Sequence, residues 1–264
     1  MTRSSILPIV AVLLLFTARS ASARTPKESI PEKHIPEECA DTLAEAASPR
    51  LGFEMGIELL SSYVSRGSYQ AGASFQPFLR VSWGGLFIGA WASTDFSGTQ
   101  MREVNLSLGY RKGRFEAALI DYYIAPHPEA EGRFFDFGHR SAHTFEASLS
   151  WSVSERVPIG IWWGTMFAGA DVADDGRRNY SSYAEISYPF ALRQAVDFKT
   201  GVGFMPWSTE NCFNTRGFAV TNVYLHAAKT WTLRRNLRLG LLARIICNPY
   251  REQFNFVGGV RFEL

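Results

Sequence analysis

Beyond its first two dozen residues, the sequence lacks any long apolar run. A membrane-spanning helix needs roughly 18 consecutive apolar residues, and no later stretch comes near that length, which excludes a helical membrane protein. Net charge is also small: 27 basic and 25 acidic residues leave +2, so we expect no nucleic-acid partner. Aromatic residues, in contrast, make up 14% of the chain, among 22 glycines and 12 prolines. This mixture excludes collagen, low-complexity disorder and coiled coils, and it favours a β-rich protein.

The N-terminus has the features of a secretory signal peptide. Arg3 precedes an apolar run over residues 6–16, and the small residues of Ala21-Ser22-Ala23 form a cleavage site. We therefore predict a signal peptide over 1–23, a flexible periplasmic leader over 24–50 and one folded domain over 51–264. Cys39 lies well downstream of the cleavage site, so we expect no lipid attachment there.

From residue 51 onward, apolar and polar residues alternate with a period of two. The clearest segments are 103–110, 145–153, 196–204 and 254–264. In the first of these, Val104, Leu106, Leu108 and Tyr110 alternate with Glu103, Asn105, Ser107 and Gly109. Such alternation predicts β-strands, and these are longer than the about 5–6 residues typical of soluble domains.

We predict about twelve strands with alternating connection lengths. The expected strands are 51–65, 72–83, 86–96, 102–111, 114–125, 141–154, 157–170, 179–190, 194–206, 218–232, 237–248 and 253–264. Tight turns alternate with longer polar loops, which is typical of a transmembrane antiparallel up-and-down β-barrel with both termini on the short-turn, periplasmic side. The alternative is a soluble all-β sandwich or a lipocalin-like barrel.

Aromatic residues sort toward the two ends of the expected strands, as in the girdles of membrane barrels. Near the short turns lie Trp83, Tyr110, Trp151, Tyr188, Phe190, Trp231 and Phe262. Near the long loops lie Tyr63, Phe96, Tyr122, Tyr123, Trp207, Tyr250 and Phe254.

Ser62, Tyr63, Arg66, Gly67 and Gln70 lie in the segment 61–70, which has the spacing S-x-Y-x-x-R-G-x-x-Q. With later matches at 89–93, 109–110, 121–123 and 183–189, it resembles the TorF family of porins of Gram-negative bacteria over essentially all of 51–264. One departure is the ending Arg261-Phe262-Glu263-Leu264, where many such barrels end in an aromatic residue. The resemblance implies an outer-membrane location and a barrel fold. We expect outer-membrane lipids and the barrel-assembly machinery as partners, and no cofactor.

Charged residues of both signs fall on the face that we expect to line the lumen. They are Glu54, Glu58, Arg80, Glu103, Glu116, Glu146, Glu185, Asp197, Lys199, Arg238, Arg244, Arg261 and Glu263. An Arg or Lys that faces lipid near the midplane costs about 2–4 kcal/mol, so these charges should face inward. Two interpretations stay open: a narrow mixed-charge lumen that passes small hydrophilic solutes, and a lumen filled by ion pairs in a non-conducting structural or interaction barrel.

An outer-membrane lipid hydrolase is a third, less favoured hypothesis. It would need a Ser nucleophile beside a His base, and His139, Ser141 and His143 lie close in sequence. They match no barrel-hydrolase motif, so we expect no catalytic site.

Two further clusters invite a metal interpretation. Asp171, Asp174 and Asp175 do not have EF-hand spacing, and His127, His139 and His143 do not have zinc-site spacing. We expect no metal site from either cluster.

The chain has 3 cysteines, an odd number for an exported protein. Cys212 and Cys247 both fall near the long-loop end, one hairpin apart, so we predict a disulfide between them, the alternative being two unpaired thiols. Cys39 would then be left over in the leader.

Overall fold

The structure is a computed structural model of the 264-residue chain, and it describes residues 50–125, 134–137, 141–192, 195–209, 212–234 and 236–264. The predicted signal peptide, Cys39 and the leader up to residue 49 lie outside the described residues, so these assignments stay predictions. No helix in the described part of the chain is long and apolar enough to cross a membrane.

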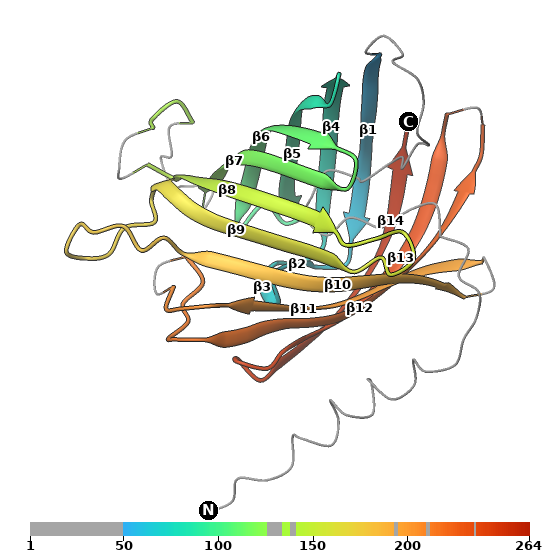
Figure 1. The fold of residues 1–264 in the computed structure, drawn as a ribbon. Coiled ribbons are helices and arrows are strands. Elements are labelled where there is room, and N and C mark those ends of the chain that lie inside the picture. The colour runs from blue at the N-terminus through green and yellow to red at the C-terminus, as the bar shows by residue number, and fades with distance from the viewer. Residues whose placement is uncertain (1–49, 126–133, 138–140, 193–194, 210–211, 235) are drawn as a thin grey trace, which may run out of the picture.

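Twelve antiparallel strands form one closed barrel (Figure 1). They are β1 (Leu51–Leu60), β4 (Ser74–Trp83), β5 (Leu86–Asp95), β6 (Arg102–Lys112), β7 (Phe115–Ala125), β8 (His143–Ser152), β9 (Gly160–Gly169), β10 (Ser182–Leu192), β11 (Val196–Met205), β12 (Ala219–Thr232), β13 (Arg238–Asn248) and β14 (Gln253–Glu263). Each strand from β4 onward pairs with the next along the chain, β1 pairs with β4, and β1 also pairs with β14. The twelve-stranded all-β barrel predicted from the alternation is confirmed.

Closure depends on the pairing of the first and last strands. Their register runs from Gly56 opposite Glu263 to Leu60 opposite Gly259. Because every barrel strand then has two neighbours, the sheet has no free edge, and the backbone hydrogen bonds of the strands are satisfied within the sheet.

The predicted tight turn between β4 and β5 has a clear backbone cause. Trp83 pairs with Leu86, which leaves Gly84 and Gly85 as a two-residue connection. Both glycines have positive φ, 58° and 89°. Left-handed conformations at both central residues define the type I′ turn, whose twist matches that of the strands it joins.

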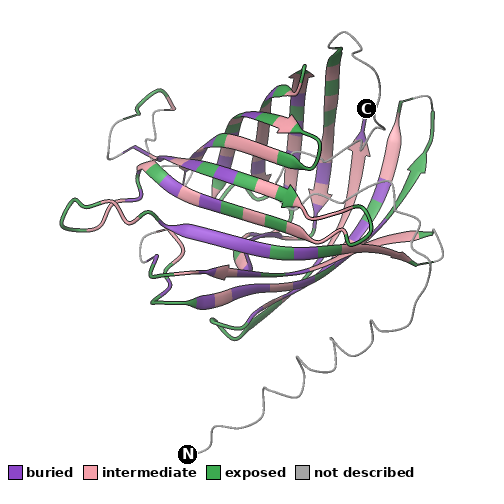
Figure 2. Cartoon of the chain, in the orientation of Figure 1, coloured by how far each residue is buried: buried purple, intermediate pink, exposed green. Residues whose placement is uncertain are grey.

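The two faces of the barrel differ in chemistry. On β6, Leu106 and Leu108 are exposed, while Glu103 and Asn105 are buried. Figure 2 shows a similar alternation of more and less exposed residues along several other strands, such as β1 and β9. Large apolar side chains thus cover the outside and charged side chains lie inside, which is the reverse of a soluble barrel. The outer face is suited to lipid as its solvent.

Most of the predicted girdle residues lie on the outside, but two do not. The exposed ones near the strand ends are Trp83, Tyr110, Trp151, Tyr188, Trp231, Phe96, Trp207, Tyr250 and Phe254. Tyr63 and Tyr122 are each only 3% exposed, and their hydroxyls donate to the buried carboxylates of Glu103 and Glu146. The prediction of these two tyrosines as girdle residues is wrong, because their hydroxyls pair with buried charges.

The connection between β1 and β4 differs most from the sequence-based prediction of a strand over 51–65 and a loop over 66–72. The first strand ends at Leu60, and a separate hairpin follows, with β2 (Tyr63–Ser65) and β3 (Ser68–Ala71). Ser65 pairs with Ser68, so Arg66 and Gly67 form a two-residue turn, with φ of 50° and 80°. Tyr63, Val64 and Ser65 are all buried, which breaks the period of two. The hairpin lies within the ring of barrel strands (Figure 1).

Adjacent residues of β6 provide a test of the two faces. Leu108 is 54% exposed and pairs with Ile88 and Leu119 on the outer face, whereas Ser107 points inward and pairs with Gly89. In lipid vesicles, Leu108→Arg should lower the free energy of unfolding in urea by about 2–4 kcal/mol, and Ser107→Arg by less than about 1 kcal/mol. Equal losses at the two positions would contradict the assignment of the faces.

Candidate functional site in the barrel lumen

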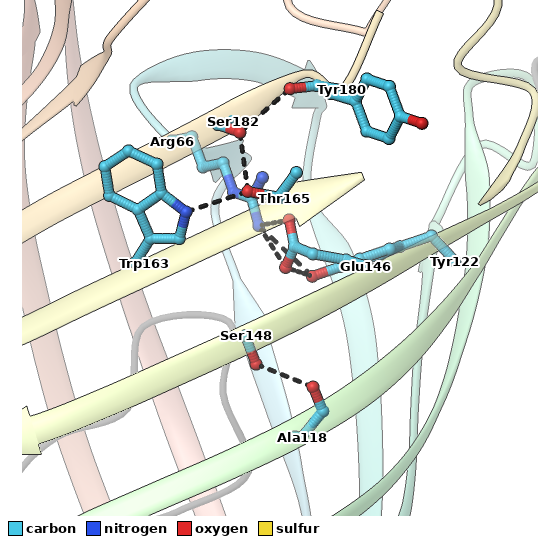
Figure 3. A network of polar contacts seen from close by, with 9 residues as sticks. All are labelled: Arg66, Ala118, Tyr122, Glu146, Ser148, Trp163, Thr165, Tyr180 and Ser182. Atoms are coloured by element: carbon cyan, nitrogen blue, oxygen red, sulfur yellow. Dashed lines mark hydrogen bonds and ion pairs between the residues drawn. The ribbon is translucent and has the colours of Figure 1, made fainter. Parts of the chain in front are cut away.

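The tip of the β2–β3 hairpin places one arginine deep in the lumen. The Nη2 of Arg66 donates to both carboxylate oxygens of Glu146 on β8, at 2.9 and 2.7 Å (Figure 3). Arg66 is 8% exposed and Glu146 is fully buried. The hydroxyl of Tyr122 on β7 donates to the same carboxylate at 2.9 Å. Charge-assisted bonds of this kind are the stronger class of hydrogen bonds.

Aromatic rings surround the Arg66 guanidinium. Its central carbon lies 5.0 Å from the ring centroids of Trp162 on β9, Tyr183 on β10 and Phe213 in the β11–β12 connection. The Tyr122 ring is 6.0 Å away. Ring faces attract cations within about 6 Å. We call the residues that surround the guanidinium the Arg66 cage: Tyr122, Glu146, Trp162, Tyr183 and Phe213.

Two further contacts hold the hairpin. The Tyr63 hydroxyl donates to Oε2 of Glu103 on β6 at 2.8 Å, and Asn248 on β13 donates to the Gly67 carbonyl at 3.1 Å. A side chain at Gly67 would place its Cβ 1.8 Å from the carbonyl oxygen of Thr221 on β12. The hairpin therefore contacts walls formed by β6, β8, β12 and β13, and it spans the lumen at this level.

The position of Arg66 is unfavourable in free energy for two reasons. A non-glycine residue with φ near 50° is uncommon and costs free energy, of order 1–3 kcal/mol for sparsely populated conformations. Its Nη1 is buried without a hydrogen-bond partner among the described residues. The ion pair with Glu146 therefore holds the hairpin in a conformation that is not otherwise favoured.

A second group of polar residues lies beside the cage. Glu185 on β10 accepts hydrogen bonds from the hydroxyls of Tyr183 at 2.8 Å and Tyr224 at 2.7 Å. Its carboxylate also lies 3.6 Å from Nζ of Lys199 on β11. Asn222 donates to the Tyr183 hydroxyl at 3.0 Å. Tyr183 thus connects this group to the Arg66 cage.

A third group lies on β1, β13 and β14. Glu58 is 3.8 Å from both Arg244 and Arg261. Arg261 also contacts Glu263 at 3.1 Å, and Glu263 pairs with Arg238. These three arginines therefore share two carboxylates on one side of the barrel.

A fourth group lies toward the short-turn end. Arg80 and Arg111 pair with Glu116 at 3.1 and 2.6 Å, and the Arg80 guanidinium stacks 3.6 Å from the Phe87 ring centroid. Glu54 is in register with Arg80 on the neighbouring strand.

The residues predicted to line the lumen all lie at inward positions of their strands, and nearly all belong to these groups. Asp197 is the exception, since it is partly buried at the start of β11 and has no ion pair among the described residues. The sequence reasoning missed Trp162, Tyr183 and Tyr224. Tyr183 shares its parity with Glu185, two residues away, and that spacing could have placed it inside.

The residues considered for a hydrolase are placed for other roles. His143 is fully buried, with Nδ1 2.8 Å from Oδ1 of Asp121 and Nε2 2.6 Å from the carbonyl oxygen of Phe134. Ser141 Oγ accepts from the backbone N–H of His143 rather than contacting the ring. Both ring nitrogens are therefore engaged away from the hydroxyl. His127 and His139 lie outside the described residues.

The three aspartates considered for a metal do not converge. Asp171 is buried and accepts from the N–H and hydroxyl of Ser181 at 2.8 and 2.7 Å. Asp175 pairs with Arg177, and Asp174 is exposed. No group of three or more His, Cys, Asp or Glu in the described part of the chain is placed to hold a metal ion.

The predicted disulfide between Cys212 and Cys247 is wrong, because both thiols are free. Cys212 Sγ donates to Oδ1 of Asp171 at 3.3 Å. Cys247 lies between the buried Ile246 and Asn248 on β13, so it points to the outer face. The wall of the barrel separates the two thiols.

Comparisons with known proteins add little to this geometry. No protein-family model matches the chain, and no curated protein matches it. Among solved structures, it is similar to a "KdgM porin", with a TM-score of 0.43 and 5% identity over 80% of this chain and 97% of the other. It is also similar to an outer membrane channel from Pseudomonas putida F1, with a TM-score of 0.41 and 12% identity over 86% and 98% of the two chains. At these scores neither similarity bears on what this barrel does.

The buried ion pair can be tested by removing one charge. Glu146→Gln leaves the Arg66 cation buried without its counter-charge, which should cost about 3–5 kcal/mol. Because the hairpin can undock locally, the expected readout is amide hydrogen exchange in β2 and β3, faster by about 100-fold or more. Glu155→Gln, in the exposed β8–β9 turn, is the matched control and should change nothing. Similar exchange in both variants would show that the pair does not hold the hairpin.

Thiol chemistry offers an independent test of the cysteines. Burial, reinforced by the Asp171 carboxylate, raises the pKa of the Cys212 thiol to about 12. Only the thiolate is nucleophilic, so at pH 8 the folded protein should react with maleimide at Cys212 far more slowly than after unfolding. In a Cys39→Ser, Cys247→Ser background, equal labelling rates before and after unfolding would contradict this burial.

Proposed function

We propose that this protein is an outer-membrane channel of a Gram-negative envelope that gives small hydrophilic solutes passive passage through a narrow, mixed-charge lumen. The observation that carries the proposal is the reversed distribution of side chains around a closed sheet, with apolar residues outside and paired charges inside. A closed barrel is one of two architectures that satisfy the backbone in lipid.

The predicted signal peptide supports export, and an exported barrel with an apolar exterior needs a bilayer. Its expected partners are therefore outer-membrane lipids, the barrel-assembly machinery and the solutes that pass through. These partners follow from the proposed location and the chemistry of the outer face.

Lumen size and charge limit what can pass. Barrels of about 8 strands hold little beyond side chains and those of about 16 hold an aqueous channel, so twelve strands give an intermediate width. The β2–β3 hairpin narrows this lumen further. Because the inner charges pair with one another, as Glu58 does with Arg244 and Arg261, we expect weak selectivity between anions and cations.

The second candidate is a non-conducting structural or interaction barrel. The specific observation in its favour is the same hairpin, which contacts β6, β8, β12 and β13. If the hairpin never moves, the lumen is filled at this level. A lipid hydrolase receives no such support, since His143 and Ser141 are not placed as a base and a nucleophile.

Planar-bilayer conductance of the refolded protein tests the proposal. The wild-type barrel should conduct weakly, and a variant in which a short Gly-Ser linker replaces residues 62–72 should conduct several-fold more, because the linker cannot span the lumen. The matched control replaces residues 173–177, an exposed loop at the same end of the barrel, and should conduct as the wild type does.

The other outcomes separate the alternatives. Silence from both the wild type and the hairpin-replaced barrel would overturn the channel and favour the structural barrel. Turnover of phospholipid by the same preparation would favour the hydrolase.

A further inference from the structure

We propose that the Arg66 cage is a binding site for the guanidinium group of a small organic cation, and that Arg66 occupies it in this structure as an internal ligand. This proposal names a class of solute for the channel proposed above. Binding to the cage does not depend on that proposed function; only the effect of binding on the passage of solutes rests on it.

The cage has the chemistry of a cation site apart from Arg66 itself. Glu146 is fully buried, and a carboxylate in such a place needs a cation beside it. The Tyr122 hydroxyl fixes one of its oxygens, while the faces of Trp162 and Tyr183 lie 5.0 Å from the bound guanidinium. A flat, weakly hydrated guanidinium fits between rings better than a compact, strongly hydrated ammonium does.

Arg66 fills this site imperfectly, and the hairpin backbone is the reason. A free guanidinium can bind a carboxylate with two parallel N–H···O bonds from two nitrogens. Arg66 instead uses one nitrogen, Nη2, for both oxygens of Glu146, and its buried Nη1 has no partner among the described residues. Its left-handed φ of 50° adds strain. A solute that is not tied to the chain avoids both costs.

The rest of the hairpin is short enough to move when Arg66 is displaced. Strands β2 and β3 span 3 and 4 residues, and an isolated two-stranded hairpin is marginally stable in water. Its other side-chain anchors include the bonds from Tyr63 to Glu103, from Asn248 to the Gly67 carbonyl and from Tyr69 to Gln100, and Val64 packs in a buried apolar cluster with wall residues such as Leu60 and Tyr224. Without the pair to Glu146, the tip loses its attachment to β8. Binding of a guanidinium solute and release of the hairpin would thus be one event.

Guanidinium chloride at millimolar concentration, far below denaturing levels, is a direct probe, and urea is its neutral counterpart of the same shape. In Arg66→Ala the cage is vacated, so guanidinium should cause a saturable change in tryptophan fluorescence at constant ionic strength. The wild-type protein should require at least about tenfold more guanidinium, because Arg66 competes for the site. Urea should cause no saturable change in either protein.

Two controls locate the signal. Adding Glu146→Gln to Arg66→Ala should weaken guanidinium binding at least about tenfold, because the carboxylate is lost. Adding Trp162→Phe should remove most of the fluorescence change, because Trp162 is the tryptophan whose ring faces the guanidinium. Equal responses to guanidinium and urea, or binding that Glu146→Gln leaves unchanged, would overturn the proposal.

The wild-type protein provides a second measurement in case Arg66→Ala does not fold. Guanidinium should accelerate hydrogen exchange in β2 and β3 of the wild type relative to the same concentration of urea. The absence of any difference would also overturn the proposal.

Conductance then separates this inference from the proposed function. If guanidinium binds the cage but the barrel never conducts, the binding site is supported and the proposed channel is overturned. If the barrel conducts but guanidinium does not bind, the proposed channel is supported and the binding site is overturned.

Discussion

The ion pair between Arg66 and Glu146 is the interaction on which the arrangement of the lumen depends. A fully buried carboxylate on β8 requires a cation, and the neighbouring strands place uncharged residues beside it: Ile120 and Met166 in register, and the Tyr122 hydroxyl. The cation arrives from the other side of the barrel, on a hairpin that leaves the wall after Leu60. The burial of one charge therefore determines where a segment of about a dozen residues lies. It also decides how far the lumen is filled.

The same electrostatic requirement shapes the rest of the interior. Charges cannot face lipid without a cost of about 2–4 kcal/mol for Arg or Lys, so the strands direct them inward. Inside, they form separate groups, such as Glu185 with Lys199 and Glu116 with Arg80 and Arg111. Each group largely neutralises itself, so the lumen is polar without being strongly of one sign. This balance of charge is the reason for our proposal that the lumen passes small hydrophilic solutes of either charge.

Much of the fold was predictable because its information is local. The alternation of Val104, Leu106 and Leu108 with Glu103 and Asn105 reports burial one residue at a time, and the structure places each of them accordingly. The same parity placed the charged residues of β1, β13 and β14 on one face. Turns such as Gly84-Gly85 are also predictable locally, because glycine readily adopts the positive φ that the turn requires. The girdle prediction failed for two residues because it inferred exposure to lipid from a position near the end of a strand. Tyr63 and Tyr122 lie near strand ends, as girdle residues do, yet buried carboxylates draw both inward.

The amino-acid sequence alone was enough to predict the twelve barrel strands, the inward position of the charged strand residues and the mixed charge of the interior. Each of these depends on a period of two that one strand shows alone. The folded barrel was needed to show that residues 62–72 enter the lumen, that Arg66 reaches Glu146 80 positions later, and that Cys212 and Cys247 lie on opposite sides of the wall. Those contacts join segments whose relative position is set only when β1 meets β14 and the barrel closes.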